Sequence, residues 1–369
     1  MEYQTPQFYH VMQYAAAADG NVIDMVSGNP DWEPPVAIRE GLRKYADSDT
    51  KAFQYPPSDG LVDLKNEISV QQNVNPNRVI ITNGTGEANY LAMARGLTDD
   101  RGDGVVLIDP VYPYYIGKTS MLGGSPKLVE ANHDGSLNVA ATCDAITDST
   151  AVVMLNSPNN PTGSVYDLEA IEAVSETAAD HDALVVVDEV YDQFDFTGTF
   201  QSALTLEAEN IVVTGGVSKS MAITGFRVGY AVFPPALVDD AKTRHMLINV
   251  TTSRPAQRAV VNAYRETNSE YYADSRDRLR SRIETFTDGL DSAGADYTLP
   301  DGGFYVLARF EGFAGTMENV KMLIDEAGVA GMPGETFGNA REDWIRFALV
   351  TPQVKAATER LIDYFGDRT

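Results

Sequence analysis

Cysteine and histidine are scarce in this chain of 369 residues, which has one cysteine, Cys143, and four histidines. A single cysteine excludes an intrachain disulfide and fits a reducing cytoplasm, which is the expected location. No apolar run is long enough to span a bilayer, so no membrane partner is expected. The first ten residues lack a basic stretch followed by an apolar one, and we therefore expect no signal peptide.

Basic residues are also few: 28 lysines and arginines face 53 aspartates and glutamates, giving a net charge of −25. Such a surface repels phosphate backbones and anionic lipids, so nucleic acid and membrane are not expected partners. The acidity has two interpretations. It is an ordinary soluble surface, or it is an adaptation to high salt, where screening relieves the repulsion between like charges.

What the chain does have is apolar residues, at 43%, arranged in short runs between about 78 and 234. The expected strands are 78–82, 104–109, 151–156, 183–188, 210–215 and 229–233. Most are continuously apolar, which is typical of strands covered on both faces. Apolar residues at helical spacing in 167–182 predict a helix between two of them. The pattern predicts an α/β fold, a three-layer α/β/α arrangement around a mostly parallel sheet.

The C-terminal third has a different pattern. Residues 235–290 favour helices, with a long one over 269–290, and 296–310 and 344–350 favour strands. This predicts a smaller α+β domain. We expect a large domain at 40–245 and a small one made of 1–39 plus 246–369.

Polar residues follow the expected strands. Asn83-Gly84-Thr85-Gly86 follows the first, Asp109 and Tyr112 the second, and "NSPNNPTG" the third, whereas Asp188 with Tyr191, and then Lys219, follow the next two. In a parallel sheet these ends share one edge, where ligands bind. Each group alone has an ordinary explanation as a turn or a cap, but together they predict one crevice.

A phosphate site is the next expectation. Gly84-Thr85-Gly86 opens a helix-like segment, and the backbone N–H groups at such a start bind phosphate. Arg227 supplies the permanent positive charge that the same phosphate requires. Taken alone, these residues are better explained as an ordinary turn and a surface arginine.

The ordered motifs carry a resemblance. The chain resembles the fold-type I, pyridoxal-phosphate-dependent aminotransferases of class I/II over nearly its whole length. The motifs are "SGNPDWEPP" (27–35), "YPPSDGLVDLKNEI" (55–68), "TNGTGEA" (82–88), "DPVYPYY" (109–115), "NSPNNPTG" (156–163), "VDEVY" (187–191), "SKSMAITGFRVG" (218–229), "PDGGFY" (300–305) and "WIRFAL" (344–349). The resemblance implies pyridoxal 5'-phosphate as cofactor, and an amino acid and a 2-oxo acid as substrates of a ping-pong transamination. It implies no metal.

The resemblance also implies roles around the cofactor ring. Lys219 is similar to the lysine that forms the Schiff base and moves the α-proton. Asp188 is similar to the acid that pairs with the pyridine nitrogen. Asn160 and Tyr191 resemble donors to the phenolic oxygen, and Tyr112 resembles the residue whose ring stacks on the cofactor.

Other positions resemble the family's phosphate and substrate ligands. The implied phosphate ligands are Gly84, Thr85, Gly86, Ser218 and Arg227. Arg346 resembles the arginine that pairs with the substrate α-carboxylate, and Gly28 falls where the main chain closes over substrate. Tyr55 matches a tyrosine that reaches the neighbouring subunit's phosphate, which implies a homodimer with shared active sites.

Three points stay open from the sequence. The family often has a serine where this chain has Gly216, so one phosphate contact is lost unless water or Thr214 replaces it. Arg254 is a candidate second cation for a dicarboxylic substrate, with a surface arginine as the alternative. Phe8, Tyr9 and Tyr14 could line the mouth of the substrate site, as the N-terminal segment often does in the family, and simple packing is the favoured alternative.

Three other functions are alternatives to transamination. A β-lyase or decarboxylase on the same fold uses the same lysine, aspartate and arginine. A dinucleotide-dependent dehydrogenase is suggested by Gly84-Thr85-Gly86 with Asp109, but Asn89 occupies the third glycine position of that fingerprint. A ligand-sensing regulator is disfavoured because no basic, DNA-binding segment accompanies the motifs.

Overall fold

The computed structural model describes residues 7–18, 20–98 and 102–366, so the opening decapeptide is described only from Gln7. Its main feature is a seven-stranded sheet in the order β2-β8-β7-β6-β5-β3-β4. β8 is antiparallel to both of its neighbours, and the other strands all run in one direction. The strands are β2 (Val79–Asn83), β3 (Gly104–Asp109), β4 (Ser125–Glu130), β5 (Thr150–Asn156), β6 (Leu184–Asp188), β7 (Ile211–Gly216) and β8 (Val228–Val232).

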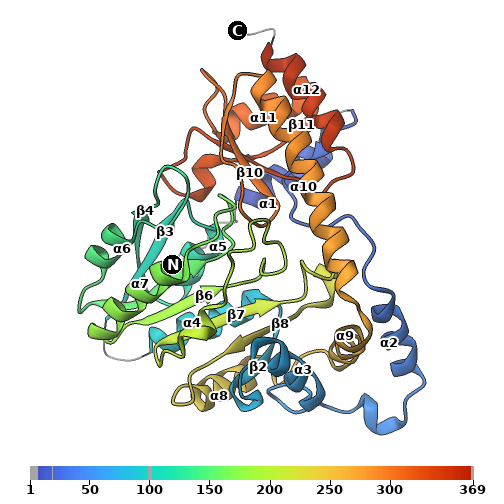
Figure 1. Ribbon diagram of the computed structural model, residues 1–369, viewed down its shortest axis with the longest axis vertical. Coiled ribbons are helices and arrows are strands. Elements are labelled where there is room, and N and C mark those ends of the chain that lie inside the picture. Colours follow the sequence, from blue (N-terminus) through green and yellow to red (C-terminus); the bar gives the residue numbers. More distant parts are fainter. Residues whose placement is uncertain (1–6, 19, 99–101, 367–369) are drawn as a thin grey trace.

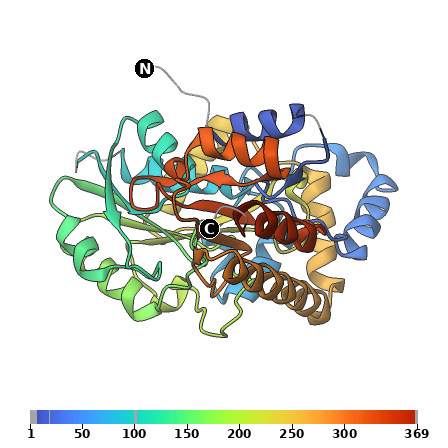
Figure 2. The same ribbon diagram turned by 90° about the horizontal axis from the view of Figure 1, so that it is seen from above.

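Helices cover both faces of this sheet, which confirms the predicted three-layer α/β/α class (Figures 1 and 2). One apolar core joins alternate strand residues to α2 (Val36–Ala46), α3 (Val62–Gln72), α6 (Val139–Ala145), α7 (Leu168–Asp180) and α9 (Arg254–Glu266). The other core joins the remaining strand residues to α4 (Thr85–Gly96), α5 (Pro113–Met121) and α8 (Val238–Asn249). Burial on both faces explains the continuous apolar runs of the strands.

A smaller unit with its own core stands beside the carboxyl end of the sheet. Its antiparallel sheet has the order β12-β13-β10-β9, and β1 pairs with β11. The strands are β1 (Ile23–Asp24), β9 (Asp296–Tyr297), β10 (Tyr305–Arg309), β11 (Val329–Ala330), β12 (Met332–Pro333) and β13 (Ile345–Ala348). The helices are α1 (Gln7–Ala17), α10 (Ser269–Ser292), α11 (Met317–Ala327) and α12 (Val354–Gly366). α10 runs along one side of the molecule from α9 to this unit (Figure 1).

Short 3₁₀ turns complete the chain: η1 (Thr50–Phe53), η2 (Pro76–Arg78), η3 (Ala203–Leu206), η4 (Thr224–Phe226) and η5 (Gly334–Phe337). Among the described helices, none combines the length and the apolar character needed to cross a bilayer. The expected strand at 296–310 is in fact two short strands separated by a turn. The sheet also has an edge strand, β4, that the apolar pattern did not predict.

Candidate active site

Residues at the carboxyl ends of five parallel strands, β2, β3, β5, β6 and β7, line one cavity of about 290 Å³. Strands of the small unit close it from the opposite side. Of the site residues expected from the sequence, the cavity is lined by Gly28, Thr85, Gly86, Tyr112, Asn160, Asp188, Tyr191, Ser218, Lys219, Arg227 and Arg346. Gly84 and Tyr55 do not line it. A concave site with a few converging polar groups is the usual form of a small-molecule site.

The amine of Lys219 projects into this cavity from the segment that follows β7. Its Nζ donates a 2.7 Å hydrogen bond to the carbonyl oxygen of Gly28. Burial, together with the neighbouring cations Arg346 and Arg227, lowers the pKa of Lys219 to about 8, and Asp188 acts in the opposite direction. An appreciable share of this amine is therefore neutral near pH 7, as a nucleophile or a general base requires.

The carboxylate of Asp188, the last residue of β6, is buried and held by three donors. Its Oδ2 accepts hydrogen bonds from Asn89 Nδ2 and the Tyr115 hydroxyl, both at 2.7 Å, and its Oδ1 accepts one from the Val190 N–H at 3.1 Å. Burial raises the pKa of Asp188, whereas these hydrogen bonds and the nearby Lys118 lower it. The donors fix the carboxylate's orientation and leave Oδ1 able to accept another bond.

The sequence analysis missed Asn89 and Tyr115 as partners of Asp188. Asn89 lies on the buried side of α4, and its Oδ1 accepts a 2.5 Å hydrogen bond from Thr214 Oγ1. A buried asparagine within an apolar helix face is a signal that could have identified it. Thr214 is wholly buried and turned to Asn89, so the suggestion that its hydroxyl replaces a phosphate contact at Gly216 is wrong.

The glycine at position 216 has a local packing reason. A Cβ placed there would lie 2.6 Å from Thr85 Oγ1, whose hydroxyl donates to the Gly215 carbonyl at 3.1 Å. The space that a serine side chain needs is therefore occupied by Thr85, which also lines the cavity.

The start of α4 and Arg227 form a cationic cradle. Gly84 is the residue before the helix and has φ +77°, and a Cβ there would overlap the Arg227 guanidinium. Arg227 donates to the Thr224 carbonyl at 2.9 Å and to the Asn83 carbonyl at 3.2 Å. Glycine at position 84 thus lets the guanidinium approach the free N–H groups of the helix start, and together they suit a phosphate.

Arg346, on β13, is the buried cation on the opposite side of the cavity. Its Nη1 donates to Asn160 Oδ1 at 3.1 Å and its Nη2 to the Val26 carbonyl at 2.6 Å. Its Nε has no hydrogen-bond partner among the described residues. A buried guanidinium with an unused N–H group is suited to bind a carboxylate.

Aromatic rings surround this guanidinium. Its central carbon lies 4.3 Å from the ring centroid of Tyr305, 5.1 Å from that of Phe337 and 6.0 Å from that of Phe8. The Tyr305 hydroxyl is 3.2 Å from that of Tyr191. Tyr305 lies in the motif at 300–305, for which no role was predicted. Phe8 lines the cavity, which agrees with the less favoured of its two interpretations.

Residues 20–362 of the chain match the family described as aminotransferase class I and II. The chain belongs to this family. It is 30% identical over 368 residues to the aspartate aminotransferase of Bacillus subtilis (strain 168), covering 94% of this chain and 91% of that protein. It is 30% identical over 354 residues to a probable aspartate/prephenate aminotransferase of Thermus aquaticus, covering 92% and 90%.

A solved structure agrees with the sequence comparison. Thermus thermophilus aspartate aminotransferase with maleate superposes on this aminotransferase with a TM-score of 0.89 at 26% identity, covering 98% of this chain and 97% of that one. The expected fold and family are therefore confirmed, and the protein is a pyridoxal-phosphate-dependent aminotransferase. Its substrates as a class are amino acids and oxo acids.

Residues outside the cavity of the aminotransferase also had expected roles. Tyr55 is 82% exposed. Arg254 Nη1 donates to the carbonyls of Lys51 and Gln54, both at 2.9 Å. Arg254 therefore binds the loop that precedes Tyr55 and makes no contact with the cavity of its own chain.

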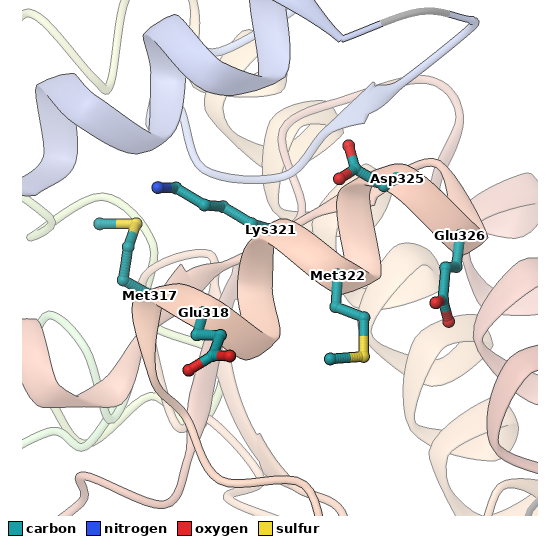
Figure 3. A pocket seen from close by; sticks show the side chains of 6 residues that line it. All are labelled: Met317, Glu318, Lys321, Met322, Asp325 and Glu326. Atoms are coloured by element: carbon teal, nitrogen blue, oxygen red, sulfur yellow. The ribbon is translucent and has the colours of Figure 1, made fainter.

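The aminotransferase has another, more open hollow of about 510 Å³ on α11. Figure 3 shows that its side chains diverge: Lys321 and Asp325 point to one side of the helix, Met322 and Glu326 to the other. Asp325 accepts a 2.7 Å hydrogen bond from the Tyr14 hydroxyl of α1. Because a single helix lines this hollow and no polar groups converge in it, it lacks the features of a catalytic site.

Proposed function

We propose that this aminotransferase moves the amino group of an L-amino acid to a 2-oxo acid by a ping-pong mechanism, with Lys219 as the attachment point of the cofactor. One observation carries the proposal. The Lys219 amine, the Asp188 carboxylate, the Asn160 amide and the Arg346 guanidinium line the same cavity although they come from separate strand ends. A set of amine, acid, amide and carboxylate-binding cation fits both pyridoxal phosphate and an amino acid.

The residues present fit the cofactor's shape and charge. When bound, pyridoxal phosphate supplies an aldehyde that combines with amines and a pyridine ring that accepts electrons from the α-carbon. Asp188, with a free acceptor position on Oδ1, is suited to the pyridine N–H. Tyr112 offers a ring face. The proposed phosphate ligands are Thr85, Gly86, Ser218 and Arg227. Gly84, which does not line the cavity, contributes by leaving room for the Arg227 guanidinium.

The protein's own groups would orient the substrate and move its proton. The unpaired Nε of Arg346, with Asn160 beside it, would hold the substrate carboxylate. The Lys219 amine, whose pKa is lowered to about 8, can take a proton from the α-carbon and return it. Tyr191 and Asn160 are the proposed donors to the ring's phenolic oxygen. The rings of Tyr305 and Phe8 exclude water from the Arg346 side.

The proposed amino-acid substrate carries a second carboxylate on its side chain. Several relatives are named for aspartate, and we propose that Arg254 of a second copy recognises the distal carboxylate. Its Nε is buried without a hydrogen-bond partner among the described residues. Replacing Arg254 with alanine is expected to raise the KM for aspartate or glutamate and to leave that for alanine unchanged. Equal changes for all three amino acids would contradict this role.

A homodimer with shared active sites is likewise proposed. The dimer face, residues 53–55 and 246–250, carries exposed apolar side chains, among them Tyr55 (82% exposed) and Leu247 (79% exposed). The two segments are adjacent, since Thr251 Oγ1 donates to the Pro57 carbonyl at 3.1 Å. A contiguous apolar surface of this kind is typical of subunit contacts. In the proposed dimer, Tyr55 reaches the partner's phosphate site, as the resemblance implies.

The domain division and the location also stay proposals. The division places 40–245 in the large domain, and the packing of α2 and α9 on the core of the large sheet favours extending it to include both helices. A cytoplasmic location is proposed on the single cysteine.

Borohydride reduction of the holoenzyme followed by peptide mapping tests the central proposal. The cofactor should be fixed on Lys219. Lys118 is an internal control because it lines the same cavity and burial lowers its pKa to about 8 as well. Label on Lys118, or on neither lysine, would reject the assignment.

A half-reaction screen with each amino acid then identifies the substrate and the reaction. Transamination converts the cofactor to its amine form and needs an oxo-acid acceptor to turn over. A β-lyase releases pyruvate and ammonia without an acceptor, and a decarboxylase releases carbon dioxide.

A further inference from the structure

A buried histidine–carboxylate pair lies directly behind the proposed phosphate cradle. Glu87, in the first turn of α4, has Oε1 2.6 Å from Nδ1 of His245 on α8. Its Oε2 accepts a 2.6 Å hydrogen bond from the N–H of Asn83, the residue before Gly84. His245 is wholly buried and the Glu87 side chain is 9% exposed. The pair therefore connects α8 to the backbone that opens the cradle.

Glu87 poses an electrostatic problem for a phosphate site. Its carboxylate occupies the same first helical turn whose N–H groups would bind the phosphate dianion. The Glu87 side chain is only 9% exposed, so water screens this carboxylate poorly. Arg227 lies on the other side of Asn83 and binds its carbonyl. A positive or donating group is needed on the Glu87 side, and the His245 side chain contacts that carboxylate.

His245 has an unusual arrangement for a packing residue. Its Nε2 is buried and has no hydrogen-bond partner among the described residues. Leaving a ring nitrogen unpaired is unfavourable, so a histidine at this position needs a compensating interaction. The side-chain contact that the structure shows for His245 is the one with Glu87.

We propose that His245 is a positioning residue of the cofactor phosphate site: it offsets the charge of Glu87 and holds that carboxylate against the Asn83 amide, so that the cradle accepts a phosphate. The inference rests on the proposed function, which makes the cradle a phosphate site. The alternative is that Glu87 only caps the helix and His245 only fills space. Replacing His245 would then destabilise the protein and weaken the binding of every ligand equally.

The test compares two ligands that differ in the phosphate alone, pyridoxal 5'-phosphate and pyridoxal. Dissociation constants are measured by absorbance on apoenzyme of the wild type and H245N, which retains a donor near the Nδ1 position but cannot carry a charge. Binding of the phosphate ester should weaken about tenfold, and binding of pyridoxal by less than about twofold. The matched control is H181N, because the exposed pair His181–Asp148, at 2.7 Å, is a similar contact far from the cradle.

The double variant E87Q/H245N makes the test specific to charge. Without the carboxylate there is no charge to offset, so the affinity for the phosphate ester should return to within about threefold of the wild type. Equal losses for both ligands, no loss for either, or no recovery in the double variant would overturn the proposal.

E87Q alone covers the case in which H245N does not fold. Its amide oxygen can still accept from the Asn83 N–H, so it should bind the phosphate ester at least as tightly as the wild type; weaker binding would overturn the proposal. If the proposed function itself is wrong, the wild-type protein gives a different result. The wild-type apoenzyme would then show no preference for the phosphate ester over pyridoxal, and borohydride would fix no cofactor on Lys219.

Discussion

The Lys219 ammonium donates a 2.7 Å hydrogen bond to the carbonyl of Gly28, a residue 191 positions earlier in the chain. The lysine follows a central strand of the large sheet, and the glycine follows β1 of the small unit. A Cβ on Gly28 would lie 3.5 Å from this Nζ and would overlap the Tyr305 hydroxyl. The contact thus fixes the reactive amine between the two units of the molecule.

Reaction of the apoenzyme with an aldehyde should follow the titration of Lys219. Because burial lowers its pKa to about 8 from the ordinary 10.5, the neutral amine increases between about pH 7 and 9. The initial rate of absorbance change on adding pyridoxal 5'-phosphate should rise with a midpoint near pH 8, and K219R should abolish it. A midpoint above pH 10 would contradict the burial of this amine.

Glu189 should make the protein less stable as pH rises. Burial raises its pKa to about 8 from 4.5, offset only in part by hydrogen bonds such as that from the Ala203 N–H at 2.8 Å. Between those pH values the folded state holds a proton that the unfolded state has lost. The free energy of unfolding should therefore fall as pH rises across this window, by up to about 1.4 kcal/mol per pH unit from this group.

Urea unfolding of the wild type and E189Q from pH 5 to 8 measures this contribution. Glutamine resembles the protonated acid, so the downward slope should be reduced in E189Q. The exposed Glu172 offers a control, since E172Q should leave the profile unchanged. Parallel profiles for the wild type and E189Q would show that Glu189 is ionised in the folded state.

Replacing Gly216 with serine should destabilise the protein. The new Cβ would lie 2.6 Å from Thr85 Oγ1 and 3.2 Å from Gly229 Cα, and overpacking of this kind costs about 1–3 kcal/mol. Thermal unfolding of the apoenzyme measures the loss. G117S is the matched control because nothing lies within 4 Å of a Cβ at Gly117. A gain in stability or in cofactor affinity would contradict the packing argument.

Replacing Arg346 with lysine should reduce kcat/KM by about 100-fold or more. A single ammonium cannot keep the bonds to Asn160 and the Val26 carbonyl while also presenting a planar pair of donors to a carboxylate. The loss should appear for every amino-acid substrate and should not appear in the rate of cofactor binding. If kcat/KM is retained, the α-carboxylate is held elsewhere.

High salt should stabilise this protein. The net charge of −25 causes self-repulsion that ions screen, so the melting temperature should rise as KCl is added to dilute buffer. Full stability in dilute buffer would favour an ordinary acidic surface over adaptation to salt.

The sequence predicted those features that depend on burial. The central strands are apolar on both faces, so their positions and the polar residues at their ends could be predicted. β4 was missed because it is an edge strand, with exposed Ser125, Pro126 and Lys127 at its start. A strand of that composition has no periodic apolar signal, and proline is tolerated at an edge.

The site residues that were missed act through other residues. Asn89 and Tyr115 contact Asp188 from two helices, and their role depends on how α4 and α5 pack against β6. Tyr305 lies against the Arg346 guanidinium from the small unit. Such contacts depend on tertiary packing, which local sequence patterns do not specify, whereas Lys219 and Arg346 lie in recognisable motifs.

The cavity takes one of its walls from Gly28 near the start of the chain and another from Arg346 near its end. Shortening the protein from either terminus would therefore remove part of the reactive chamber before it removed any of the central sheet. Any attempt to engineer a minimal version should keep both ends and delete surface loops instead.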